Sequence, residues 1–197
     1  MVTIDFGYNA GYKLAMAQPD VQALRATLGT FATGVTIVTC EVDGEVHGAT
    51  VNSFTSVSLD PPLVLACLSK RSKACGYLQG SNFTVNILSA DQQLHALHFA
   101  GRPQDTLVTA FEDGDFAPRI QGCVGYVSCL PWKVVDAGDH DLIIGQVADI
   151  KVSDNLAGRQ PLLFYRGAFW RLGSASDSLA AMADVYADLH LTSALSW

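Results

Sequence analysis

The amino-acid sequence predicts a mainly β protein whose antiparallel strands close on themselves, with a few helices at the flanks. Many short apolar runs rich in β-branched residues follow one another along the chain, and few helical patterns separate them. Turn-forming pairs stand between several of these runs. The sequence also lacks the G-x-G-x-x-G and Walker patterns, so a nucleotide would have to be held by something other than a Rossmann or P-loop unit.

The chain is expected to open with an arm and a helix. Residues 1–18 show no periodicity, and we expect a loose arm that could fold over a neighbouring subunit, followed by one domain over residues 19–197. Asp20 can cap a helix whose apolar residues recur every three or four positions and therefore share one face. These residues are Leu24, Leu28 and Phe31.

A hairpin and an apolar strand come next. Two apolar runs within residues 35–51 flank the turn pair Asp43-Gly44, which is typical of a tight hairpin. Pro61-Pro62 then breaks the chain before the run from Leu63 to Leu68. Because this run is apolar throughout, we expect a strand that is buried on both faces. Ser72 can cap a short helix after it.

The second half of the chain contains further strands, a helix and a long connection. Residues 82–88 alternate as a strand does, and Ser89 with Gln92 predicts a capping box for a helix that Gly101 ends. Residues 102–118 carry charges, a proline and a glycine, and are expected to form a mobile surface excursion. The remaining predicted elements are strands at 122–129, 132–136, 141–152 and 162–172, the last with a turn at Arg166-Gly167, and a terminal helix opened by Asp177.

Composition and charge restrict the class of protein. The 197 residues are 49% hydrophobic and 16% charged, which describes one globular core with an apolar surplus of the kind found in subunit interfaces. A formal net charge of −7 argues against a nucleic-acid or membrane partner. No signal peptide or membrane-spanning run is recognisable, so we expect a cytoplasmic protein. The five cysteines form no C-x-x-C pair and are interpreted as core thiols.

One segment holds more hydrogen-bonding side chains than an ordinary buried strand. In residues 50–58, TVNSFTSVS, six of the nine side chains are small hydroxyls or amides, and each one that is buried needs a partner. Val51, Phe54 and Val57 lie among them and are expected to be buried. This mixture fits the wall of a pocket for a flat ligand with polar edges. A Ser/Thr-rich edge strand is the alternative.

A basic cluster follows the apolar strand directly, in the segment SKRSKA. Lys70, Arg71 and Lys73 lie within four positions of an otherwise acidic chain, next to the hydroxyls of Ser69 and Ser72. Together with the first amides of the following helix, these groups could bind a phosphate. A solvated basic turn is the alternative interpretation.

Three motifs resemble the flavin reductase-like family, whose members have an FMN-binding split barrel. They are FATGV (31–35), GATVNSFTSVSLDPPL (48–63) and GDHDLIIGQV (138–147), and the resemblance covers roughly residues 24–172. Many members have Gly-Met-Thr where this chain has Gly48-Ala49-Thr50. The resemblance implies a closed antiparallel split β-barrel of the Greek-key type. It also implies an NAD(P)H:flavin oxidoreductase that reduces FMN or FAD and supplies a partner flavin-dependent monooxygenase.

The resemblance further implies which residues form the site. The expected flavin contacts are Thr33, Val35, Thr36, Ala49, Thr50, Val51, Asn52, Ser53 and Ser56, with Ser69, Arg71, Ser72 and Lys73 at its phosphate. The expected NAD(P)H contacts are His140, Tyr165 and Arg166, with His140 near the nicotinamide. We expect no metal site, because His95 and His98 have no further ligands to complete one and are interpreted as helix surface.

Several alternatives remain open at this point. The chain could be a flavin-binding storage or redox-sensing protein without reductase turnover. An oxidase of the pyridoxamine-phosphate type shares the split barrel, but the motifs of that group are not visible here. We expect a homodimer. The choice between FMN and FAD, the choice between NADH and NADPH, the retention or release of the flavin, and the identity of the monooxygenase are not determined by the sequence.

Overall fold

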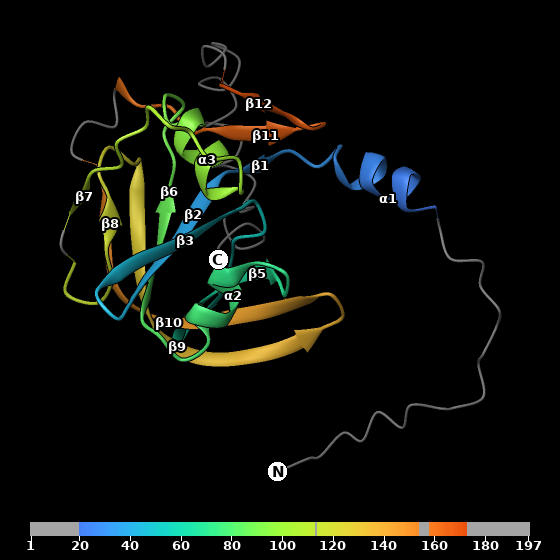
Figure 1. The fold of residues 1–197 in the computed structure, drawn as a ribbon. Helices are drawn as coiled ribbons and strands as arrows, with labels where there is room; N and C mark the ends of the chain where they lie inside the picture. The colour runs from blue at the N-terminus through green and yellow to red at the C-terminus, as the bar shows by residue number, and fades with distance from the viewer. Residues whose placement is uncertain (1–19, 113, 154–157, 173–197) are drawn as a thin grey trace, which may run out of the picture.

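The computed structural model describes residues 20–112, 114–153 and 158–172, which Figure 1 draws in colour. The predicted N-terminal arm and the terminal helix lie outside these residues. Within them, antiparallel strands dominate, and the mainly β class is confirmed. No helix of the described residues is long and apolar enough to cross a membrane.

A seven-stranded antiparallel sheet forms the body of the molecule, in the order β3-β2-β6-β9-β10-β5-β4. Two small sheets, β1-β11-β12 and β7-β8, accompany it. The strands are β1 (Thr33–Gly34), β2 (Thr36–Val42), β3 (Glu45–Val51), β4 (Thr55–Leu59), β5 (Pro62–Ser69), β6 (Phe83–Ile87), β7 (Phe111–Glu112), β8 (Arg119–Ile120), β9 (Gly125–Ala137), β10 (His140–Val152), β11 (Leu163–Tyr165) and β12 (Ala168–Trp170). The helices are α1 (Val21–Leu28), α2 (Lys73–Leu78) and α3 (Gln93–Phe99).

The edges of the large sheet are β3 and β4, which follow each other in the chain. No ladder of backbone hydrogen bonds joins these two strands in the described residues, so the closed barrel remains a prediction. A single side chain spans part of the gap. Ser53 Oγ donates to the carbonyl oxygen of Cys67 at 2.8 Å and accepts from its N–H at 3.1 Å. Because β4 pairs with β5 only as far as Leu65, Ser53 satisfies the backbone of β5 beyond that point.

Local signals place the N-terminal elements as the sequence predicts. Asp20 caps α1 by accepting from the N–H of Ala23 at 3.1 Å. The hairpin β2-β3 turns at Asp43 and Gly44, whose φ angles of 54° and 78° are the two positive values that its turn type requires. Gly101 follows α3 with a φ of 78°, as a helix stop does.

Some element predictions were wrong. The strands expected at 122–129 and 132–136 form one strand, β9, because its pairing with β10 continues past Pro131 through a register shift. β5 is fully buried on one face only, since its other face borders a cleft described below. The capping box is half formed: the N–H of Ser89 donates to the side chain of Gln92, and α3 begins only after that residue.

The expected surface excursion is anchored at its end. Ala117 is buried, and its carbonyl oxygen accepts from the hydroxyl of Thr84 at 3.2 Å. The neighbouring carbonyl of Pro118 accepts from Thr39 at 2.6 Å, and the fully buried Asn86 accepts from the N–H of Ile120. These buried hydroxyl and amide groups hold the segment against β2 and β6.

A glycine in the middle of β10 permits the densest contact in the main core. A Cβ atom added to Gly145 would collide with the ring of Phe83 and would lie 2.7 Å from the Cβ of Cys129. Both neighbours are fully buried, and a Cβ atom cannot rotate away. The glycine of the GDHDLIIGQV motif is therefore required by packing.

We expect Gly145→Ala to lower the free energy of unfolding by about 1–3 kcal/mol, because the added methyl group overpacks the core. Gly76→Ala is the matched control, since Gly76 lies in α2 with no atom within 4 Å of the added Cβ. There the gain in helix propensity should leave stability unchanged or raise it by up to about 1 kcal/mol. Urea denaturation of both variants measures the difference, and equal midpoints would contradict this packing role.

Candidate functional site

A cleft of about 620 Å³ opens between β3, the end of β5 and the two helices α2 and α3. β3 runs between these helices (Figure 1), and its residues from Gly48 to Val51 line the cleft. The cleft brings together nine of the residues predicted from the sequence. They are Ala49, Thr50, Val51, Asn52, Ser53, Ser69, Ser72, Lys73 and His140.

One wall of the cleft depends on the close approach of α3 to β3. A Cβ atom on Gly48 would lie 2.9 Å from Cδ1 of Phe99, so the aromatic ring packs directly on the strand backbone. Beside this contact, the hydroxyl of Thr50 donates to the carbonyl oxygen of Ala96 at 2.8 Å. These two contacts bring the end of α3 to the cleft.

The sequence interpretation missed this contribution of α3. His98 lines the cleft, whereas the sequence analysis placed it on the helix surface. Its Nδ1 accepts from the N–H of Gln104 at 3.2 Å, which fixes the ring. The signal that could have found this wall is Gly48, because a glycine inside a strand marks a close approach of another group. The other lining residues that were not predicted are Gly48, Cys67, Leu68, Ala74, Phe99, Ala100 and Gly101.

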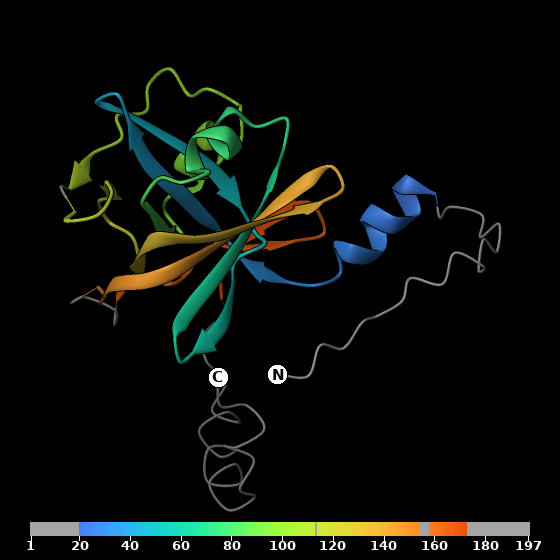
Figure 2. The ribbon, with the colours of Figure 1, turned by 90° about the horizontal axis from the view of Figure 1, so that it is seen from below.

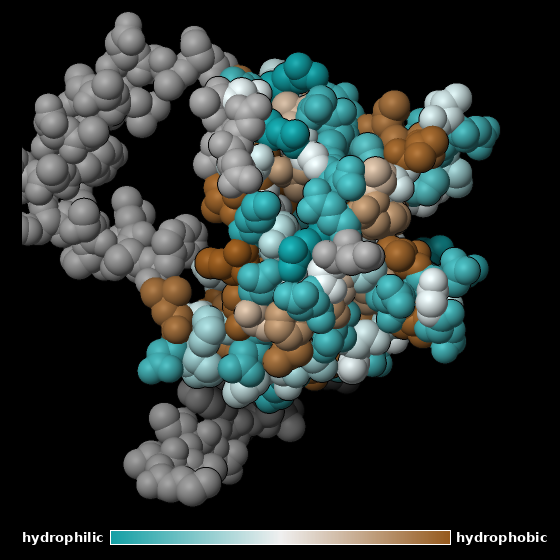
Figure 3. All heavy atoms as spheres, turned by 90° about the vertical axis from the view of Figure 1, so that its left-hand side faces the viewer, coloured by the Kyte–Doolittle hydropathy of each residue, from teal (hydrophilic) through white to brown (hydrophobic). Residues whose placement is uncertain are grey.

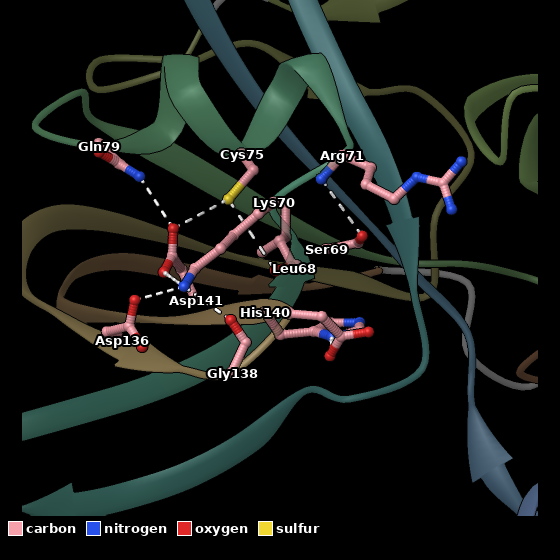
Figure 4. A network of polar contacts seen from close by, with 11 residues as sticks. Leu68, Ser69, Lys70, Arg71, Cys75, Gln79, Asp136, Gly138, His140 and Asp141 are labelled. Atoms are coloured by element: carbon pink, nitrogen blue, oxygen red, sulfur yellow. Dashed lines mark hydrogen bonds and ion pairs between the residues drawn. The ribbon is translucent and has the colours of Figure 1, made fainter. Parts of the chain in front are cut away.

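The basic cluster is divided between the cleft and the turn that joins β9 and β10. Lys73, the first residue of α2, lines the cleft together with the hydroxyls of Ser69 and Ser72. Lys70 instead points toward Asp136 and Asp141, while the guanidinium of Arg71 extends the other way (Figure 4). Arg71 is exposed and does not line the cleft. Of the three cations in this cluster, only Lys73 is therefore placed to bind a phosphate in the cleft.

Asp141 is the centre of the polar network beside the cleft, shown in Figure 4. Asp141 is only 6% exposed. Its carboxylate accepts a hydrogen bond from the side-chain amide of Gln79 at 3.0 Å and one from the thiol of Cys75 at 3.5 Å. Lys70 Nζ lies 3.7 Å from its other oxygen. The hydrogen bond to Asp136 raises the pKa of Lys70, and the same bond lowers the pKa of Asp136. Both groups of this exposed pair are therefore charged at neutral pH.

His140 begins β10 directly after the turn and lies opposite Ser69 of β5 in the sheet register. Its side chain is 41% exposed, and its ring lines the cleft. Nδ1 lies 2.7 Å from a carboxylate oxygen of Asp139, and this hydrogen bond lowers the pKa of Asp139. When Nδ1–H donates to Asp139, Nε2 remains available to a ligand.

Several predicted site residues lie outside the cleft, and the structure gives a reason for each. Val35 and Thr36 are buried within the fold, with the hydroxyl of Thr36 bonded to the carbonyl oxygen of Val51 at 3.1 Å. Thr33 belongs to β1, which pairs with β11. Ser56 is exposed on the edge strand β4, as the alternative interpretation of its segment predicts. Val57, expected to be buried, is 49% exposed on the same strand.

The hairpin β11-β12 is also outside the cleft. Tyr165 and Arg166 lie at its tip, where the N–H of Arg166 donates to the carbonyl oxygen of Gly29 at 2.8 Å. Arg166 therefore contacts the end of α1 and does not line the cleft. The resemblance implied an NAD(P)H contact for both residues, and the position of the hairpin within this chain gives no support for one.

Comparison with known proteins gives consistent matches. A family model described as "Flavin reductase like domain" matches residues 28–173. The NADH-dependent flavin reductase of Rhodococcus sp is 41% identical over 150 residues, covering 74% of this chain and 83% of that protein. The 4-hydroxyphenylacetate 3-monooxygenase reductase component of Thermus thermophilus is 33% identical, covering 77% of this chain and 96% of that protein. The Streptomyces globisporus NADH:FAD oxidoreductase, solved in complex with NAD and FAD fragments, has a TM-score of 0.72 at 36% identity over 80% of this chain and 96% of that one.

We expect Cys67 to be the first of the five cysteines that iodoacetamide alkylates. It lines the cleft, whereas Cys40, Cys75, Cys123 and Cys129 are all buried. Burial, followed by the charges of Asp139 and Asp141, raises the pKa of the Cys67 thiol. Its thiolate is therefore scarce at neutral pH, and the labelling rate should keep rising with pH beyond about 8.5, where the rate for an ordinary thiol begins to level off. Peptide mass mapping against pH measures this, and earlier labelling of any other cysteine would contradict it.

Proposed function

The chain belongs to the flavin reductase-like family, and we propose that its cleft is where it reduces FMN or FAD with NADH or NADPH. The chain is an NAD(P)H:flavin oxidoreductase, and its reduced flavin serves a partner monooxygenase. The observation that carries the assignment of the site is the meeting of three features at one cleft. These are the polar end of β3, Lys73 at the start of α2, and His140 at the start of β10.

The residues of the cleft fit a flavin. Asn52 is exposed there, and its side chain forms no hydrogen bond among the described residues, so its donors and acceptors are available to the polar edge of the ring. Ala49 and Val51 of β3 also line the cleft, although both are largely buried in the core behind it. Lys73 and Ser72, whose hydroxyl makes no capping bond to α2, suit the phosphate. We also propose that Ser53 closes the split barrel at this wall, through its two hydrogen bonds with Cys67.

Hydride transfer requires the protein mainly to bind and orient the flavin and the nicotinamide. When bound, the flavin supplies the group that accepts the hydride, and the nicotinamide supplies the hydride. The chain's own residues bind and orient both rings, which lowers the entropic part of the barrier. His140, held by Asp139, would contact the nicotinamide from the start of β10. No carboxylate lines the cleft among the described residues, which agrees with a reaction that needs no acid or base from the protein.

The decisive experiment for this function is an anaerobic titration with NADH and NADPH in the presence of FMN or FAD. Loss of the visible absorption of the flavin, with sustained turnover once oxygen is admitted, is the expected result. The more effective nicotinamide also identifies the reductant. Tight flavin binding without turnover would instead describe a storage or redox-sensing protein and would overturn the proposal.

We further propose a homodimer, because α1 and the residues that follow it offer an apolar face that the other described residues leave exposed. Leu28 and Phe31 are 65% and 76% exposed, and α1 has no buried residue in the described chain. Figure 1 and Figure 2 both show α1 standing away from the body of the sheet. The face that carries β7 and β8 differs, since hydrophilic and hydrophobic residues are mixed over its described part (Figure 3). A second copy of the chain would bury the α1 face.

We expect Lys73→Met to weaken FMN binding by about five- to ten-fold, because it removes a charge-assisted contact to the phosphate. Riboflavin lacks the phosphate, so its affinity should hardly change. Arg71→Met is the matched control, since Arg71 lies two positions away and does not line the cleft. Fluorescence titration with both ligands measures the effect. Equal losses for FMN and riboflavin would show that Lys73 supports the shape of the cleft and does not bind phosphate.

We expect Leu28→Glu to weaken self-association by more than ten-fold, because a carboxylate would be buried in an apolar interface. Gln22→Glu adds the same charge at an exposed polar position of α1 and should leave association unchanged. Light scattering over a range of micromolar concentrations measures both. A wild-type chain that stays monomeric throughout this range while fully active would refute the homodimer.

A further inference from the structure

We propose that Lys70 is a positioning residue that couples the two ligand-binding parts of the cleft. It lies outside the cleft lining, yet it joins the loop proposed to hold the flavin phosphate to the turn that carries His140. The inference rests on the proposed function of the cleft and deepens it, because it predicts that nicotinamide binding and flavin binding depend on one ammonium group.

The contacts of Lys70 span three segments of the chain. Its Nζ donates to the carboxylate of Asp136 near the end of β9 and to the carbonyl oxygen of Gly138 at 2.7 Å. It also lies 3.7 Å from the carboxylate of Asp141 in β10. The backbone N–H of Lys70 donates to the carbonyl oxygen of Asp139 at 3.1 Å. Main chain and side chain together therefore fix the turn from both ends (Figure 4).

Both segments that Lys70 joins continue directly into the cleft. On its own segment, Ser69 precedes it and Ser72 and Lys73 follow it, and all three line the cleft. On the turn, Asp139 comes next and holds the ring of His140. A shift of the turn relative to the loop would therefore move His140 relative to Lys73. Because each of these two residues is proposed to contact a ligand, such a shift would weaken ligand binding.

An exposed ion pair would not carry this role by itself, since such pairs contribute little to stability. The side chain of Asp136 is 79% exposed, but that of Asp141 is only 9% exposed. Removing the ammonium group would leave the Asp141 carboxylate with Gln79 and Cys75 as its side-chain partners. The nearly buried charge would then lack its cation, which is destabilising, and the segments around it would rearrange.

The test compares Lys70→Met with the wild type and with Lys133→Met, which removes an exposed lysine of β9 outside this network. We expect Lys70→Met to raise the KM for the nicotinamide about five-fold and to weaken FMN more than riboflavin. We also expect kcat at saturation to change less than two-fold, since the reacting groups stay in place once both ligands are bound. Lys70→Arg should restore part of the loss, and Lys133→Met should change neither ligand.

A double-mutant cycle separates positioning from general stabilisation. If Lys70 acts through His140, Lys70→Met should have little further effect on the nicotinamide KM in the His140→Ala background. If the effects of Lys70→Met and His140→Ala on the nicotinamide KM were fully additive, the proposal would be overturned. Wild-type affinities of Lys70→Met for both ligands would also overturn it. If Lys70→Met does not fold, Asp136→Asn tests the same link by removing the exposed partner, and wild-type values there would equally overturn it.

Failure of this proposal can be told from failure of the proposed function. Reductase turnover of the wild type tests the function alone. The ratio of FMN to riboflavin affinity in Lys70→Met relative to the wild type tests the link to the loop by direct binding, without any turnover. A wild type that binds FMN without oxidising NADH or NADPH would overturn the function, while an unchanged ratio in the variant would overturn the role of Lys70.

Discussion

The end of β3 is held between two contacts that leave almost no freedom, and the cleft depends on both. On one side, the ring of Phe99 rests on the backbone at Gly48, where a single added carbon would already be too close. On the other side, the Ser53 hydroxyl exchanges two hydrogen bonds with Cys67 and so connects the strand end to β5. A strand end fixed from both sides presents its side chains at defined positions. For a reaction that depends on orienting two planar rings, this rigidity is what the protein supplies.

The polar network around Asp141 has the same effect beside the cleft, on the start of β10 and on α2. It links α2 through Gln79 and Cys75, and it links the loop after β5 through Lys70. Each contact alone is weak or partly exposed, but together they attach a six-residue helix and a tight turn to one strand. The turn then delivers His140, and α2 delivers Lys73. Hydrophobic packing of their own side chains does not hold His140 and Lys73 in place, so their positions depend on this network.

Periodicity and turn chemistry predict most of the fold from the sequence. The Asp43-Gly44 turn, the Asp20 cap and the stop at Gly101 are local signals that the structure confirms, whereas Ser72 makes no capping bond to α2. The burial of Val57 and the apolar strand buried on both faces were wrong, because burial depends on neighbours that the sequence does not place. The same limit separates the basic cluster. Lys70, Arg71 and Lys73 are close in sequence, but Lys70 and Arg71 extend in different directions (Figure 4), and only Lys73 lines the cleft.

The site shows a related limit, since a motif can mark a constraint other than ligand binding. FATGV contributes Val35 to a buried cluster and exposes Phe31 on the surface, and neither lines the cleft. GDHDLIIGQV combines two demands in one strand: His140 at the cleft, and Gly145 where Phe83 and Cys129 leave no room for a side chain. A motif shared with a family contains residues of both kinds, and the resemblance alone does not show which residue serves the site and which serves packing. Only the contacts separate the residues that line the cleft, which we propose bind the ligands, from the residues that the fold requires.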